Sequence, residues 1–158
     1  FKGFTPSDRA RLQQAEALWE KHKDRLPYPK SEIPLGEKTK SGLLAHHYNH
    51  WHEMFFPRQL LALATLLKGI KEERDESLRE MLLCALSTTL EVNNQFVRDI
   101  PSRNTPGGTP PAGVFARHDY QPKVTILEQN VWGVVSGRGV FSNNWAKLIS
   151  GKEYNLTP

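Results

Sequence analysis

Residues 57–98 constrain the fold most strongly, because they hold two helical patterns in direct succession. Pro57 suits the first position of a helix, and the residues after it are apolar on most sides up to about residue 72. Ser77 and Glu80 have the spacing of a capping box, which would begin a second helix that reaches residue 98. We therefore expect two antiparallel helices, with the first at the centre of the fold.

A further helix is predicted near the amino end of the chain. Thr5 is a suitable N-cap, Pro6 suits the first helical position, and Asp8 lies three residues after the cap. Apolar residues then recur at helical spacing until Pro27. Residues 27–42 carry prolines and glycines among charged residues and are expected to form an irregular connector.

The second half of the chain has a different character. Residues 99–113 are rich in proline and glycine and predict a loop, residues 114–135 hold β-type residues, and residues 141–148 favour a short closing helix. The predicted fold is mainly α: a helical bundle of three to four helices with a small irregular or β C-terminal part. Residues 1–98 would be the helical part and residues 114–158 the irregular or β part.

Composition excludes several classes of protein. The chain has 158 residues, of which 38% are hydrophobic and 24% charged, and this balance is typical of a soluble globular domain. No apolar run approaches the ~18 residues of a membrane-spanning helix, so no membrane partner is expected. Cys84 is the single cysteine, which rules out an internal disulfide and a multi-cysteine zinc site and favours a cytoplasmic location. On the apolar stripe of its helix, this thiol is expected to be buried. The chain begins at Phe1 without a methionine, and we interpret it as a single domain, a fragment of a larger protein or the ordered remainder of one.

Four histidines fall within seven residues, between positions 46 and 52. On a helix, His46 and His50 would share a face one turn apart, which is workable spacing for two metal ligands. The alternative is a packing segment, in which Tyr48 and Trp51 supply the apolar contacts. Both interpretations stay open at the level of sequence.

Basic and aromatic residues interleave in the second half of the chain. Arginine and lysine neutralise phosphates, and aromatic faces stack on unpaired bases, so this pattern suits a nucleic-acid surface. Acidic residues interrupt it, and a solvated surface is the alternative. The net charge of +4 permits a nucleic-acid partner without requiring one. Residues 136–141 are rich in glycine and predict either a phosphate site or a tight turn. The cations expected to contact phosphate are Arg103, Arg117, Lys123 and Arg138.

Two long stretches carry a resemblance to a known family. The first runs from Trp51 to Leu63 and reads WHEMFFPRQLLAL, and the second runs from Tyr120 to Phe141 and includes YQPKVT, EQNVWG and GRGVF. Both resemble the middle region of large bacterial and archaeal proteins described as adenine-specific DNA methylases, and the resemblance covers nearly the whole chain. The motif residues that we expect to be structurally important are Trp51, Arg58, Gln59, Asn130, Trp132 and Gly133.

The resemblance implies a parent enzyme that uses S-adenosylmethionine in a Rossmann-like domain. In that family a glycine-rich cofactor motif precedes this region and a DPPY-type catalytic motif follows it, and this chain contains neither. We therefore expect no cofactor and no catalytic residue here. The chain would be a non-catalytic helical insertion that helps to bind DNA or to position the target strand. The alternatives are a scaffold or interaction module that packs on the parent enzyme or on a partner subunit, and a small metal-binding protein.

Overall fold

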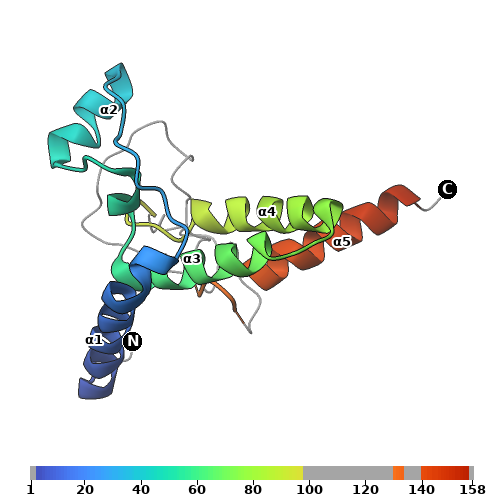
Figure 1. The fold of residues 1–158 in the computed structure, drawn as a ribbon, viewed down its shortest axis with the longest axis horizontal. Helices are drawn as coiled ribbons and strands as arrows, with labels where there is room; N and C mark the ends of the chain where they lie inside the picture. Colours follow the sequence, from blue (N-terminus) through green and yellow to red (C-terminus); the bar gives the residue numbers. More distant parts are fainter. Residues whose placement is uncertain (1–2, 98–129, 134–139, 157–158) are drawn as a thin grey trace, which may run out of the picture.

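Helices dominate the computed structural model, which describes residues 3–97, 130–133 and 140–156. Figure 1 shows the order of the elements along the chain. Within the described ranges there is no β-strand, and the fold class predicted from sequence is confirmed. The α-helices are α1 (Pro6–His22), α2 (Glu37–Ser41), α3 (Pro57–Lys71), α4 (Glu76–Glu91) and α5 (Phe141–Leu156), and 3-10 turns span Lys23–Arg25, Leu44–His46 and Trp51–Met54.

Helix α1 begins as its sequence predicts. The Thr5 N–H donates to Asp8 Oδ2 at 3.0 Å, and the Asp8 N–H donates back to Thr5 Oγ1 at 3.3 Å, which completes a capping box. Farther along the helix, Trp19 is buried against Leu60 and Ala64 of α3. This contact fixes α1 across the beginning of α3 (Figure 1).

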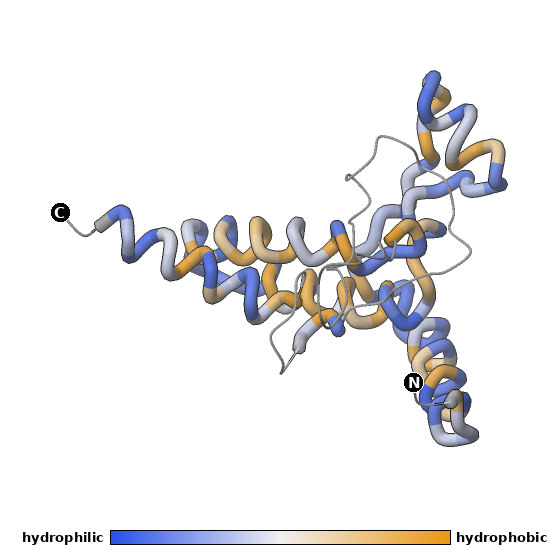
Figure 2. The backbone as a smooth tube through the Cα atoms, turned by 180° about the vertical axis from the view of Figure 1, so that it is seen from behind, coloured by the Kyte–Doolittle hydropathy of each residue, from blue (hydrophilic) through white to orange (hydrophobic). Residues whose placement is uncertain are grey.

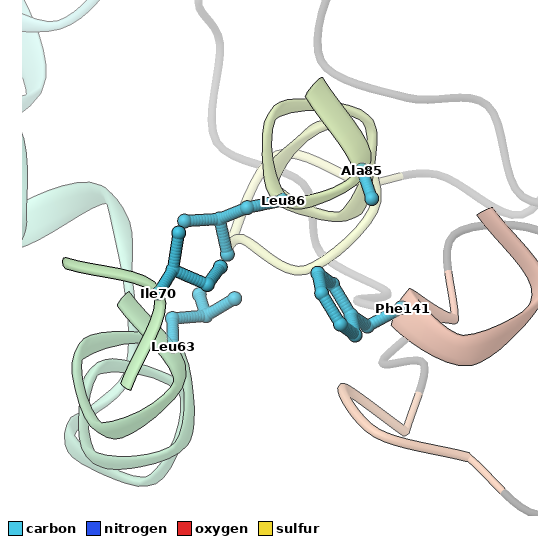
Figure 3. Packing of buried hydrophobic residues seen from close by; sticks show 5 residues of the cluster. All are labelled: Leu63, Ile70, Ala85, Leu86 and Phe141. Atoms are coloured by element: carbon cyan, nitrogen blue, oxygen red, sulfur yellow. The ribbon is translucent and has the colours of Figure 1, made fainter. Parts of the chain in front are cut away.

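Helix α3 lies at the centre of the fold, as expected, because it contacts α1 on one side and α4 on another. Helix α5 lies along α4, and its C-terminal end extends past the turn between α3 and α4 (Figure 1). Leu63 and Ile70 of α3 meet Leu86 of α4, and Ala85 and Phe141 complete this cluster (Figure 3). Figure 2 shows that apolar residues concentrate along α3 and α4, whereas the distal end of α5 is mostly polar.

Helix α4 differs from its predicted bounds at both ends. Its N-cap is Asp75, whose Oδ1 accepts a hydrogen bond from the Leu78 N–H at 2.9 Å, so the predicted cap at Ser77 is wrong. The helix ends at Glu91 and not at residue 98. The Asn93 and Asn94 side chains end it, because their amide groups donate to carbonyl oxygens of its last turn.

Two further expectations need correction. The segment 27–42, predicted to be an irregular connector, contains the short helix α2. Ile33, which precedes this helix, is buried with Leu43, Met54 and Phe96. Cys84 is exposed and not buried, because α4 turns Ala85 and Leu86 toward the core.

The segment between α2 and α3 is tied to the end of α4 by one glutamine. The Gln95 N–H donates to Met54 O at 2.9 Å, and Gln95 Nε2 donates to Glu53 O at 3.0 Å. The Tyr48 hydroxyl donates to Gln95 Oε1 at 3.2 Å. These bonds hold the two 3-10 turns of residues 44–54 against the bundle.

The closing helix is present and is longer than predicted, since α5 continues to Leu156. The expected Pro/Gly loop of residues 99–113 and most of the expected β region lie outside the described residues. In the parts of the chain that are described, no helix has the length and apolar character needed to cross a bilayer.

Candidate functional site

A cavity of about 550 Å³ lies between the first half of α3 and residues 130–132. It brings together two segments that are more than sixty residues apart in the sequence. The described residues that line it are Arg58, Gln59, Ala62, Thr65, Leu66, Asn130, Val131 and Trp132.

The first wall is built by the N-terminal turn of α3. Pro57 occupies the first helical position, and Gln59 Oε1 accepts a hydrogen bond from the Phe56 N–H at 2.9 Å. The Arg58 guanidinium lies over the Phe56 ring, 4.3 Å from its centroid, which is a cation–π contact. The start of the helix thus holds one amide and one cation at the cavity.

The Gln59 side chain is only 4% exposed, and its two polar atoms are in different situations. The bond from the Phe56 N–H identifies Oε1 as the oxygen, because a backbone N–H requires an acceptor. The Nε2 donor on the other side is buried and has no hydrogen-bond partner within the described structure. A buried donor without a partner costs about 1–3 kcal/mol, so a ligand acceptor that reached it would be favoured.

The second wall is a tight turn that precedes α5. Asn130 Oδ1 accepts hydrogen bonds from the Trp132 N–H at 3.1 Å and from the Gly133 N–H at 3.0 Å. Gly133 has a φ of +67°, in the left-handed region, and a Cβ at this position would overlap the Val140 side chain. The turn therefore requires glycine for both conformation and space.

Hydrogen bonds from the Phe141 backbone and the Ser142 side chain fix this turn to the first residues of α5. The Phe141 N–H donates to Val131 O at 2.9 Å, and Ser142 Oγ donates to Gly133 O at 3.1 Å. The Trp132 ring stacks on the Phe141 ring with 5.8 Å between centroids. Despite this contact, Trp132 remains 61% exposed, so the structure holds a large aromatic surface at the cavity mouth.

The chemistry of the lining residues is that of a binding site. Arg58 supplies positive charge, Gln59 and Asn130 supply amides, and the indole supplies an aromatic face. Among the described residues that line the cavity there is no carboxylate, imidazole or thiol.

Four of the six motif residues predicted from the sequence converge on the cavity, namely Arg58, Gln59, Asn130 and Trp132. Gly133 follows Trp132 in the same turn. Trp51 is separate, since it packs against the cluster around Leu43 and Met54. The four cations expected to contact phosphate, Arg103, Arg117, Lys123 and Arg138, lie outside the described residues, as do residues 136–139 of the glycine-rich stretch.

The rest of the cavity wall was not identified from the sequence. Ala62, Thr65 and Leu66 follow Arg58 at helical spacing and therefore share its face of α3. Thr65 is an exposed polar residue that interrupts the apolar run from Leu60 to Leu67, and this interruption is the pattern that could have indicated it.

The histidine cluster does not form the predicted helical pair. His46 ends one 3-10 turn, His47 has a left-handed φ of +66°, and His50 precedes the next 3-10 turn. His46 and His50 therefore do not share one helix. Among the described residues, no group of three or more histidine, cysteine or acidic side chains is placed to hold a metal ion.

Glu53 instead organises this segment through its carboxylate. Partial burial alone would raise the pKa of Glu53, but hydrogen bonds from the backbone N–H groups of His50 and Asn49 lower it. The nearby imidazoles of His50 and His52 act in the same direction, and the net result is a pKa below the ordinary value.

The chain was compared with protein-family models, with curated proteins and with solved structures. None of the three comparisons finds a match.

Proposed function

We propose that this chain is a non-catalytic helical region that binds DNA and positions the target strand for an adenine-specific DNA methyltransferase. One observation supports the proposal above all. The two stretches that resemble such methylases are distant in sequence, yet their polar and aromatic residues line one cavity. That cavity combines a cation with an exposed aromatic ring, and these are the groups that hold single-stranded nucleic acid.

In this proposal the chemistry belongs to the rest of the parent protein. This chain contains neither the glycine-rich cofactor motif nor the DPPY-type catalytic motif. The rest of the parent would therefore bind S-adenosylmethionine and carry the catalytic motif. An enzyme that methylates a base in duplex DNA must extrude that base and hold the strand. Arg103, Arg117, Lys123 and Arg138 would supply the phosphate contacts.

The test is a titration of this chain with fluorescent DNA at several salt concentrations. Four phosphate contacts predict that log K falls with log[salt] with a slope of about −3 on a single strand. Replacing Arg103, Arg117, Lys123 and Arg138 with glutamine should remove most of this slope. A control variant replaces four cations on the described surface, Arg9, Arg11, Lys38 and Lys40, and has the same net charge. An equal loss in both variants, or no binding at low salt, would contradict the proposal.

The second candidate function is a scaffold that packs on the parent enzyme or on a partner subunit. An apolar crevice of about 110 Å³, with Tyr28, Phe55 and Leu90 in its wall, favours it, as do Ile149 and Tyr154 exposed on α5. Mixing the chain with the remainder of its parent should then give a stable complex, and replacing Ile149 and Tyr154 with serine should weaken it. Wild-type chain that stays unbound at micromolar concentration would count against this function.

A further inference from the structure

We propose that the cavity between α3 and residues 130–132 takes one unpaired nucleobase of a DNA strand, stacked on Trp132. The proposal rests on the proposed function and specifies which part of the DNA this site binds. Phosphate contacts position a strand, whereas this cavity would accept the base itself.

The aromatic face is the first reason for this assignment. Phe141 supports the Trp132 ring in a stacked arrangement, with 22° between the ring planes, while the indole remains 61% exposed. The Asn130 turn and its bonds to α5 fix the backbone on which this ring stands. A supported, exposed indole is a platform on which any base can stack, because every base has a π-face.

The unpartnered donor of Gln59 is the second reason. Its Nε2 is buried without a partner in the described part of the chain, and the same side chain lines the cavity. Nucleobases present carbonyl oxygens and ring nitrogens at their edges, and these are the acceptors that an amide N–H requires. The Oε1 atom is already used by the Phe56 N–H, so the amide is held in one orientation.

Charge and size are the third reason. Among the described residues that line the cavity, Arg58 is the one that carries a charge. Its guanidinium places a cation at the described part of the wall, and a cation suits the phosphate that accompanies a base in a strand. A volume of about 550 Å³ lies within the usual range of small-molecule sites, roughly 300–1,000 Å³.

The experiment compares two short single strands of equal length and charge, one with all its bases and one with abasic positions at its centre. Anisotropy titrations at one salt concentration give the affinity of the chain for each strand. The wild-type chain should prefer the intact strand. Trp132→Ala should lower the affinity for that strand by about 5- to 100-fold and abolish the preference.

Two further variants test the stacking and donor roles. Trp132→Phe keeps an aromatic face and should retain most of the preference for bases. Gln59→Glu keeps an oxygen for the Phe56 N–H but removes the Nε2 donor. It should lower the affinity for the intact strand more than the affinity for the abasic strand. Phe4→Ala, which removes a 67% exposed aromatic residue that precedes α1, is the matched control and should bind like the wild type.

The outcomes also separate this inference from the proposed function. Binding with a salt slope but equal affinity for the two strands would overturn the base site and leave DNA binding intact. No binding to either strand would overturn both. Free adenosine serves as a third ligand, and a Trp132-dependent affinity for adenosine with no Trp132 effect on the strands would assign the cavity to a free nucleoside and overturn the inference.

Discussion

At the scale of single residues, Gly133 is the described glycine whose conformation and surroundings both exclude a side chain. Its backbone is left-handed, and a Cβ would lie 3.0 Å from Val140 Cβ and closer still to Val140 Cγ1. Gly133→Ala should therefore lower the free energy of unfolding by about 2–4 kcal/mol, measured by urea denaturation. The matched control is Gly151→Ala in α5, where a Cβ meets nothing within 4 Å. This control should be neutral or stabilising by up to about 1 kcal/mol, and an equal loss in both variants would contradict the explanation.

Glu53 gives a pH-dependent prediction at the same scale. Its folded-state pKa is lowered, so its carboxylate contributes stability above the ordinary value near 4.3, and that contribution is lost as the pH falls through the folded pKa. Glu53→Gln should thus be less stable than the wild type at pH 7, and the difference should shrink below pH ~4. Thermal melts from pH 3 to pH 7 measure this. A difference that stays constant over that range would show that the carboxylate charge is not the cause.

At the scale of elements, the α4–α5 contact contains a buried polar pair. Asn144 Nδ2 donates to Thr89 Oγ1 at 3.0 Å, and Thr89 Oγ1 donates to Ala85 O at 2.8 Å. Thr89→Val keeps the shape but removes the acceptor at 3.0 Å, so that Asn144 Nδ2 keeps only the long bond to Ala85 O at 3.5 Å among those described, and the change should cost about 1–3 kcal/mol. Thr88→Val is the control, because Thr88 makes the same bond to the preceding turn from an exposed position. A double-mutant cycle with Asn144→Ala should give a coupling of about 0.5–2 kcal/mol, and a coupling near zero would refute the pairing.

Helix starts tell how far local sequence predicts this fold. The starts of α1 and α3 are predicted correctly from Thr5, Asp8 and Pro57. These residues act within the first turn of their own helix, so the local sequence is enough to identify them. At α4, the spacing of Ser77 and Glu80 predicts a cap at Ser77, whereas the residue that caps the helix is Asp75. The C-terminal end of α4 is predicted too late, because Asn93 continues the helical spacing, whereas the Asn93 and Asn94 side chains donate to carbonyl oxygens of the last turn.

Asp75 and Ser77 provide a test at the element scale. Asp75→Ala should lower the free energy of unfolding by about 1 kcal/mol, because Asp75 Oδ1 accepts from the Leu78 N–H. Ser77→Ala should change it by less than about 0.5 kcal/mol, since the exposed Ser77 is not the N-cap of α4. Chemical denaturation of both variants decides between the two caps, and a larger effect at Ser77 would restore the cap predicted from the sequence.

At the scale of the whole molecule, the cavity could not be predicted from spacing. The sequence marked Arg58 and Gln59 in one stretch and Asn130 and Trp132 in another, but no local pattern states that the two meet. They meet because residues 130–133 are bonded to the start of α5 and α5 packs on α4 beside α3. The cavity thus depends on three contacts: residues 130–133 with α5, α5 with α4, and α4 with α3. The hydrophobic periodicity of a sequence predicts single helices and does not predict which helices pack together.

Phe55 joins the packing of the whole molecule, because it contacts all three hydrophobic clusters of the described structure. Each cluster also has its own tryptophan, since Trp51, Trp145 and Trp19 pack in or against one cluster each. Single-tryptophan variants can thus report the clusters separately. With Phe55 in place, the urea unfolding curves of the three single-tryptophan variants should coincide, as expected for one cooperative unit.

Phe55→Ala should lower the free energy of unfolding by about 2–4 kcal/mol and separate the three curves, because it removes the ring that the clusters share. Phe4→Ala removes the same side chain from a site that is 67% exposed, and it should leave both stability and coincidence unchanged. Curves that stay coincident after Phe55→Ala would mean that α3 alone couples the clusters. Curves that are already separate in the wild-type background would mean that the helical part contains more than one folding unit, and the cavity between α3 and residues 130–132 would then depend on how α5 docks.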